Sequence, residues 1–278
     1  MKIFTTRENL HNYLAERRLT GKTIGFVPTM GALHNGHISL LQFAKTQTDE
    51  TVCSIFVNPT QFNDKRDLAL YPRPIESDSE KLRNAGCDIL FNPAVDEMYA
   101  ANESWHLDIG PLEHLLEGAS RPGHYQGVMQ VVAKLFNIVQ PDMAFFGQKD
   151  YQQFLVINKM VQQLQMPVTM VMCPIVREDD GLAMSSRNIR LSAEEREHAL
   201  VLSRSLRLVK EQLPYHTYAE LKQLAADLIS QEPGVALDYF EIADGDTLLP
   251  AQPGSAKIVA LVAAKVGNVR LIDNVILV

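Results

Sequence analysis

Short apolar runs alternate with segments of helical periodicity through the first 173 residues, and this alternation constrains the fold more than any other feature. The runs have the length of buried strands, and the segments between them carry apolar residues at i, i+3 and i+4. Strands that alternate with helices form a parallel sheet with helices on both faces. The sequence therefore predicts an α/β fold built on a doubly wound parallel sheet. The predicted strands are Ile24 to Val27, Thr51 to Val57, Asp88 to Phe91, Met143 to Phe146 and Val168 to Cys173; the predicted helices start near Gly36 and cover Ile75 to Ala85, Val128 to Val139 and Tyr151 to Leu164.

The pattern changes after about Val176 and predicts a second, smaller α+β domain. Two helical segments come first, and three apolar strands follow them. The predicted domains are therefore residues 1–176, with the parallel sheet, and residues 177–278. The helices are expected at Ser192 to Gln212 and Tyr218 to Gln231, and the strands at Leu237 to Ile242, Lys257 to Ala264 and Val269 to Val278.

Composition excludes several classes of protein. The net charge of −7 leaves no basic stripe for nucleic acid. The three cysteines are odd in number and form no CxxC pair, so neither a disulfide framework nor a structural zinc site is expected. Cys53 lies inside an apolar run and is expected to be a buried core thiol.

No targeting or membrane segment is expected. The N-terminus lacks the apolar stretch of a secretion signal. No apolar run approaches the roughly 18 residues of a membrane span. The sequence predicts a cytoplasmic protein without a membrane partner.

Ligands of doubly wound sheets bind beyond the carboxyl ends of the strands. The first such loop runs from Pro28 to His37 and contains the pattern H-x-G-H, with His34 and His37 three residues apart where a helix begins. A helix N-terminus attracts anions, glycines admit a close backbone approach, and both imidazoles can donate to phosphate oxygens. A plain surface loop and a metal-binding histidine pair remain alternatives, although no third ligand stands at a familiar spacing.

The second element is Asp180-Gly181-Leu182-Ala183-Met184-Ser185-Ser186-Arg187-Asn188. Its two hydroxyls and its guanidinium suit a charged ligand with many oxygens. A cap for the following helix is the alternative interpretation. Two further loops place glutamine amides at strand ends, in Phe56 to Phe62 and in Phe146 to Gln153. An amide can both donate to and accept from a small hydroxy acid, whereas Lys149 adds a cation.

These elements, in this order, resemble the nucleotidylyltransferase superfamily, with a HIGH-like motif at His34 to His37 and a KMSKS-like motif at Met184 to Arg187. Within it the chain resembles the pantoate–β-alanine ligase (pantothenate synthetase) family from about Ile24 to Asn274. Three further blocks agree with that family: Glu117 to His124, Lys134 to Asn137 and Arg270 to Asn274. The resemblance implies a Rossmann-like catalytic domain that binds ATP and pantoate, and a C-terminal lid next to a dimer interface.

The resemblance also implies roles for particular residues. ATP would be bound by Met30, Gly31, Ala32, Leu33, His34, Asn35, Gly36, His37, Gly147, Gln148, Lys149, Asp150, Val176, Met184, Ser185, Ser186 and Arg187. His34, His37, Lys149, Ser185, Ser186 and Arg187 would be the catalytic set. Gln61 and Gln153 would hold pantoate, Gln61 would also meet β-alanine, and Asn58 would lie in the same substrate-binding cavity. Family members use Mg²⁺ with the phosphates, and Asp78 is the candidate for assisting the metal.

The implied reaction has two steps, in which the pantoate carboxylate first attacks the α-phosphorus of ATP and the β-alanine amine then displaces AMP. A homodimer is implied as well. Two positions depart from the family pattern, because Gln148 and Gln126 stand where Glu and Arg are usual, and a lost ion pair between them is one account. Another nucleotidylyltransferase, a nucleotide-binding relative without turnover and a fragment of an RNA-binding synthetase remain alternatives, the last opposed by the acidic charge.

Overall fold

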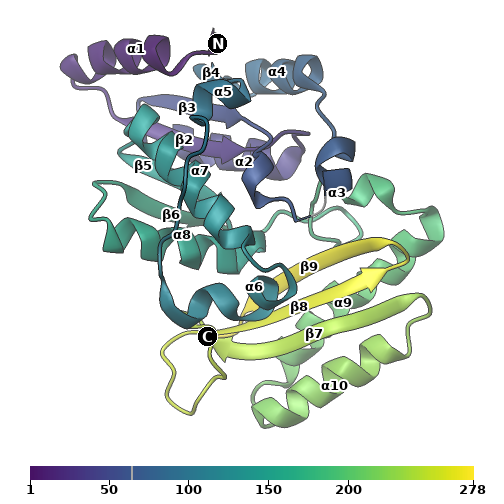
Figure 1. The fold of residues 1–278 in the computed structure, drawn as a ribbon. Coiled ribbons are helices and arrows are strands. Elements are labelled where there is room, and N and C mark those ends of the chain that lie inside the picture. Colours follow the sequence, from purple (N-terminus) through teal and green to yellow (C-terminus); the bar gives the residue numbers. More distant parts are fainter. Residues whose placement is uncertain (64) are drawn as a thin grey trace. The chain divides into compact units, whose positions relative to one another are not determined.

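A computed structural model describes residues 1–63 and 65–278, with the side chains of residues 65 and 67 left aside. The chain forms two compact units (Figure 1). Unit 1 comprises Met1–Gly147 and Gln153–Cys173, and unit 2 comprises Gln148–Gln152 and Pro174–Val278. The sequence predicted one boundary after Val176. The structure instead changes unit after Cys173 and gives the short segment Gln148–Gln152 to unit 2.

Unit 1 contains a six-stranded sheet in the order β1-β4-β3-β2-β5-β6, and every pairing between its strands is parallel. This confirms the predicted α/β class. The strands are β1 Lys2–Phe4, β2 Ile24–Thr29, β3 Glu50–Ile55, β4 Ile89–Phe91, β5 Met143–Gly147 and β6 Thr169–Cys173. The helices between them in the chain are α1 Arg7–Leu19, α2 Asn35–Lys45, α3 Lys65–Leu70, α4 Ile75–Asn84, α5 Val95–Met98, α6 Leu116–Ser120, α7 His124–Val139 and α8 Tyr151–Gln163, with the 3-10 turns η1 Pro59–Gln61 and η2 Gly110–His114. The turn η3 Gln148–Asp150 and the first two residues of α8 belong to unit 2.

Helices bury both faces of this sheet, as alternation along β2 shows. Val27 packs in one cluster with Leu41 of α2 and Leu82 of α4. Its neighbour Phe26 points to the opposite face, where its ring meets that of Phe136 on α7 at 6.2 Å between centroids. Figure 1 shows α7 lying along the sheet. Cys53, predicted as a core thiol, is 1% exposed.

Strands β2 and β5 part from each other at their carboxyl ends. Their pairing stops at Phe26 with Ala144, whereas β2 continues along β3 to the pair Thr29 with Ile55. Pro28 has no N–H to donate, so it is compatible with this parting. Strand order also reverses here, because the chain runs outward from β2 to β4 and then crosses to β5. The loops after β2 and β5 therefore leave from the topological switch point, where such sheets bind ligands.

Unit 2 is built on the antiparallel sheet β7-β8-β9, with helices α9 and α10 packed against it (Figure 1). The elements are η4 Asn188–Arg190, α9 Ala193–Gln212, α10 Tyr218–Ser230, β7 Val235–Asp244, β8 Ile258–Val266 and β9 Val269–Ile276. Ser192 and Thr217 start the two helices with reciprocal capping boxes, as hydroxyls followed three residues later by glutamate should. A separate hydrophobic core joins α9 and α10 to the sheet, so unit 2 has the predicted α+β architecture.

In the part of the chain that the structure describes, no helix combines the length and the apolar character that a membrane crossing requires.

Candidate active site

Two histidines open α2 by capping each other. His34 is the N-cap, and its Nδ1 accepts a hydrogen bond from the Gly36 backbone N–H at 3.2 Å. His37 Nδ1 accepts from the His34 N–H at 3.3 Å, and the two rings lie 4.0 Å apart between centroids, tilted by 40°. Because both Nδ1 atoms accept, the neutral form of each ring carries its proton on Nε2. The N–H of each neutral imidazole is therefore the Nε2–H, and the Gly36 N–H at the helix start is bonded within the chain.

The loop between β2 and α2 is held from the side by α4 and the segment before it. Gly31 has φ of +72°, and a Cβ there would lie 2.8 Å from Asp78 Oδ2, so glycine is required on both grounds. Asp78 Oδ1 accepts from the Leu33 N–H at 2.8 Å, and Lys81 Nζ donates to the Leu33 carbonyl at 2.7 Å. The Tyr71 hydroxyl donates to the Gly31 carbonyl at 2.9 Å. These contacts fix the backbone on which His34 stands.

Asp78, predicted to assist a metal, is buried at 1% exposure beneath this loop. Burial raises the pKa of its carboxyl, and the hydrogen bond from Leu33 acts in the opposite direction. Oδ2 has no hydrogen-bond partner in the described chain. Among the side chains that the structure describes, no three of His, Cys, Asp or Glu are grouped to hold a metal ion. The structure thus gives Asp78 a loop-holding contact, and its link to a metal stays a prediction.

The predicted substrate residues Asn58 and Gln61 lie together at η1, after β3. Gln61 Oε1 accepts from Asn58 Nδ2 at 3.0 Å, and Gln61 Nε2 contacts Met30 Sδ of the β2 loop at 3.3 Å. Asn58 is 1% exposed, and it also donates to the Gly127 carbonyl and accepts from the Tyr99 hydroxyl at 2.6 Å. Burial raises the pKa of Tyr99 to about 12, so this phenol keeps its proton and donates. Asn58 therefore orients Gln61.

Arg121 and His124 hold the same turn, although no role was predicted for either residue. His124 Nδ1 lies 2.9 Å from the Gln61 carbonyl, and its Nε2 lies 3.1 Å from Arg121 NH1. A carbonyl only accepts and a guanidinium only donates, so the neutral ring has its proton on Nδ1. The sequence feature that could have pointed to these two residues is the block Glu117 to His124, which contains an Arg and a His just before a predicted helix. It could not show that their partner is Gln61.

Gln126, which stands where the family usually has Arg, lies on α7 in unit 1. Its amide donates to the Leu107 carbonyl at 3.0 Å and to Glu113 Oε2 at 2.7 Å, and its Oε1 accepts from the Leu107 N–H at 3.0 Å. The neutral amide of Gln126 thus donates a hydrogen bond to the buried carboxylate of Glu113. An arginine at this position would have the same carboxylate as its partner.

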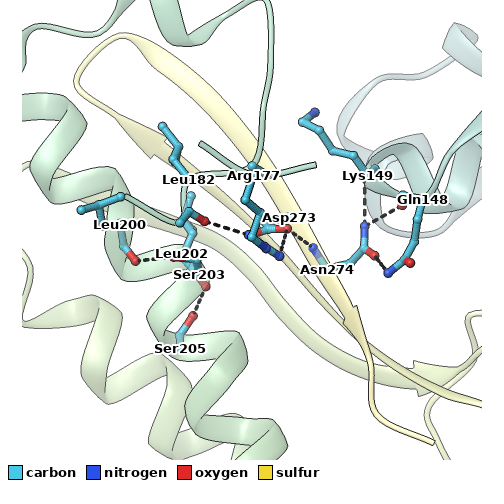
Figure 2. Close-up of polar contacts among 12 residues, drawn as sticks. Gln148, Lys149, Arg177, Leu182, Leu200, Leu202, Ser203, Ser205, Asp273 and Asn274 are labelled. Carbon is cyan, nitrogen blue, oxygen red and sulfur yellow. Dashed lines mark hydrogen bonds and ion pairs between the residues drawn. The ribbon is translucent and has the colours of Figure 1, made fainter. Parts of the chain in front are cut away.

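The predicted ATP residues Gln148, Lys149 and Asp150 form η3, the turn after Gly147. The side chain of Lys149 is 16% exposed, and its Nζ lies 3.8 Å from the Asp150 carboxylate. The amide of Asn274 bonds to both Gln148 and Lys149 (Figure 2). Gln153, predicted to hold pantoate, lies half-buried in the first turn of α8, where unit 1 resumes.

The KMSKS-like segment follows a hairpin in unit 2. Met184 N–H donates to the Val176 carbonyl at 3.0 Å, and Arg177 bridges Ala183 as an antiparallel pair. Val176, predicted to meet adenine through its backbone, thus already uses its carbonyl within the chain. Ser185 Oγ accepts from the Arg187 N–H at 3.2 Å, which shapes the turn that carries both hydroxyls.

Comparisons with known proteins agree over the whole chain. Residues 2–276 match the family model of pantoate-beta-alanine ligase. The pantothenate synthetase of Bacteroides thetaiotaomicron is 47% identical over 277 residues, covering 99% of this chain and 98% of that protein. The pantothenate synthetase of Thermotoga petrophila is 49% identical over 280 residues, covering all of both chains.

Solved structures agree as well. The crystal structure of pantothenate synthetase from Thermus thermophilus has a TM-score of 0.93 at 43% identity, covering 99% of both chains. That of pantoate-beta-alanine ligase from Francisella tularensis, complexed with beta-gamma ATP and beta-alanine, has a TM-score of 0.82 at 35% identity and covers 99% of this chain and 97% of that one. With these matches, the chain belongs to the pantoate-beta-alanine ligase family.

Proposed function

We propose that this protein condenses pantoate with β-alanine to pantothenate, using ATP and releasing AMP and pyrophosphate. The observation that carries this proposal is the reciprocal capping of His34 and His37, which fixes two Nε2–H donors at the start of α2. Family membership across residues 2–276 supplies the substrates. The complex of the Francisella relative with beta-gamma ATP and beta-alanine supports two of the three.

We assign the loop from Met30 to His37 to ATP. Tyr71, Asp78 and Lys81 hold its backbone, so the imidazole donors need little reorganisation when phosphate arrives. His37 and His34 donate to phosphate oxygens as negative charge moves onto the departing pyrophosphate.

We assign the second group of ATP residues by their chemistry. Lys149 offers a cation that is largely shielded from water, which strengthens its attraction to phosphate. Ser185, Ser186 and Arg187 add hydroxyl and guanidinium donors. Asp150 accepts from the ribose hydroxyls. The other members of this group contribute mainly through their backbone: Gly147, Gln148, Val176 and Met184.

We assign pantoate to Gln61 and Gln153, and β-alanine to Gln61 as well. Gln61 lies at 8% exposure with its amide bonded to Asn58 and in contact with Met30, so its orientation is set before the substrate binds. Pantoate carries hydroxyls and a carboxylate, which an amide can serve as donor and acceptor.

The chemistry needs activation because a free carboxylate has no adequate leaving group. In the first step a pantoate carboxylate oxygen bonds to the α-phosphorus and the bond to pyrophosphate breaks. In the second the β-alanine nitrogen bonds to the acyl carbon, AMP leaves and the amine loses a proton. The protein holds reactants in line, an effect worth about 7–11 kcal/mol in well-oriented systems. We assign no protein nucleophile.

We further propose Mg²⁺ as the counter-ion of the ATP phosphates, together with a homodimeric assembly and a cytoplasmic location. Mg²⁺ is usually held by one or two carboxylates, water and substrate phosphates. The described residues, which group no three metal-ligating side chains, are compatible with a metal that arrives with ATP. No step above depends on a metal ligand from the protein.

The test is AMP formation with each substrate omitted in turn. We expect AMP and pyrophosphate in equal amounts only when ATP, pantoate and β-alanine are all present at steady state. ATP binding without AMP under any condition would favour a nucleotide-binding relative without turnover. Pyrophosphate release with a phosphorylated substrate, and none with pantoate, would favour another nucleotidylyltransferase.

A further inference from the structure

The block Arg270 to Asn274 matched the family pattern, but no function was assigned to it. Its last two residues, Asp273 and Asn274, lie on β9 and are 4% and 2% exposed. Buried polar side chains of this kind must be hydrogen-bonded, so their partners reveal what they do.

The side chain of Asn274 is hydrogen-bonded to the turn that carries Lys149. Its Nδ2 donates to the carbonyl of Gln148 at 2.9 Å and to the carbonyl of Lys149 at 3.0 Å. Its Oδ1 accepts from Gln148 Nε2 at 3.1 Å. Both amide hydrogens and the amide oxygen of Asn274 thus bond to two consecutive residues, Gln148 and Lys149. Figure 2 shows the Lys149 side chain running away from this contact, so Asn274 fixes the backbone and leaves the ammonium for another partner.

Asp273 holds the hairpin that leads to Ser185. Its two oxygens accept from Arg177 NH1 at 2.6 Å and NH2 at 3.0 Å, a bidentate ion pair. Arg177 NH1 also donates to the Gly181 carbonyl at 3.1 Å, at the tip of the hairpin. The Asn274 N–H donates to Asp273 Oδ1 at 2.8 Å and links the two contacts (Figure 2).

Neighbouring side chains of a strand point to opposite faces of a sheet. Asp273 is two residues from Leu271 and four from Val269, so it shares a face of β9 with these two core residues of unit 2. Asn274 lies on the opposite face. One rigid strand can therefore hold two separate segments, one from each face. Both segments carry groups that we assign to the ATP phosphates.

We propose that Asp273 and Asn274 are positioning residues for the adenylation step, setting Lys149 and the Ser185 to Arg187 segment in register for the triphosphate. This inference rests on the proposed function. It adds that β9 acts more on the first half-reaction than on the second, because attack of the amine on the acyl adenylate no longer involves the pyrophosphate group, whereas Asp150 on the same turn still meets the ribose.

The experiment uses the full-length protein with Asn274→Ala, and Arg270→Gln as the matched control on the same strand, where Arg270 pairs with Asp238 at the surface. Pantoate-dependent exchange of labelled pyrophosphate into ATP reports adenylation. AMP release from added pantoyl adenylate and β-alanine reports the second half-reaction. Thermal unfolding is recorded for each variant.

For Asn274→Ala we expect exchange to fall by at least about 10-fold, in line with misplaced catalytic groups, while the rate of the second half-reaction falls by a clearly smaller factor. Arg177→Lys, which keeps the charge but loses the bidentate geometry, should show the same pattern. If Asn274→Ala does not fold, Asn274→Ser, which keeps one donor, replaces it with the same expectation.

Two results would overturn the inference. One is exchange in Asn274→Ala equal to that in Arg270→Gln. The other is an equal fall of both half-reactions, which would mark general damage to unit 2. Absence of exchange in the wild-type protein would instead refute the proposed function, so the two failures are distinguishable.

Discussion

Replacing Gly127 by alanine tests how tightly α7 holds the turn that carries Gln61. A Cβ at this position would lie 2.4 Å from the Thr60 carbonyl oxygen and 2.7 Å from the Gln61 amide nitrogen. Both are backbone atoms, so α7 and η1 must separate by about 1 Å to reach ordinary contact. Overpacking costs about 1–3 kcal/mol of folding stability, and the better helix propensity of alanine offsets about 1 kcal/mol of that.

The functional effect should exceed the effect on stability. A displacement of about 1 Å can cost about 10²-fold in rate, so we expect kcat/KM for pantoate to fall by about that factor. The unfolding temperature should fall by only a few degrees, at about 2–4 °C per kcal/mol. Steady-state kinetics and calorimetry are compared with Asn137→Ala, an exposed position on the same helix. Wild-type kcat/KM for pantoate in Gly127→Ala would refute the reasoning.

Three other substitutions test separate parts of the chain. His37→Ala should lower kcat by about 10²-fold, as loss of a transition-state donor does; an unchanged kcat would remove His37 from the catalytic set. Gln153→Ala should raise KM for pantoate more than KM for ATP, and equal changes would argue against its assignment. The hydrogen bond from His198 to Glu232 raises the pKa of His198 above 6.5, so its stabilisation is complete below that pH and is lost as pH rises through the raised value. The unfolding temperature of the wild type should therefore exceed that of His198→Gln more at pH 6 than at pH 9, and a gap that does not depend on pH would contradict this.

The parallel sheet could be predicted because most of its longer strands contain short apolar runs and its longer helices carry apolar residues at helical spacing. The first strand and the first helix were not predicted, because neither has a clear apolar pattern. β1 spans three residues, and α1 buries only Leu10 and Leu14, too narrow a stripe to stand out among its charged residues. The helices α3, α5 and α6 are four to six residues long, too short to establish a period.

The candidate site could be predicted where one motif contains both partners. The helix start near Gly36 and the pairing of His34 with His37 are local, and the sequence placed both close to where they lie. Contacts between distant positions could not be predicted. Asn274 meets Gln148 across 126 positions, and Gln61 is held by His124 across 63. Such partners become neighbours only when strands pair and helices pack, so the sequence could name the residues but not their roles.

The most direct test of the central claim follows an oxygen atom. Pantoate labelled with ¹⁸O in its carboxylate is incubated with ATP, β-alanine and the protein. The ¹⁸O content of each product is then measured by mass spectrometry. Attack of the carboxylate on the α-phosphorus predicts one ¹⁸O atom in each AMP formed and none in pyrophosphate. Formation of ADP with ¹⁸O in inorganic phosphate, or AMP without the label, would contradict the adenylate mechanism.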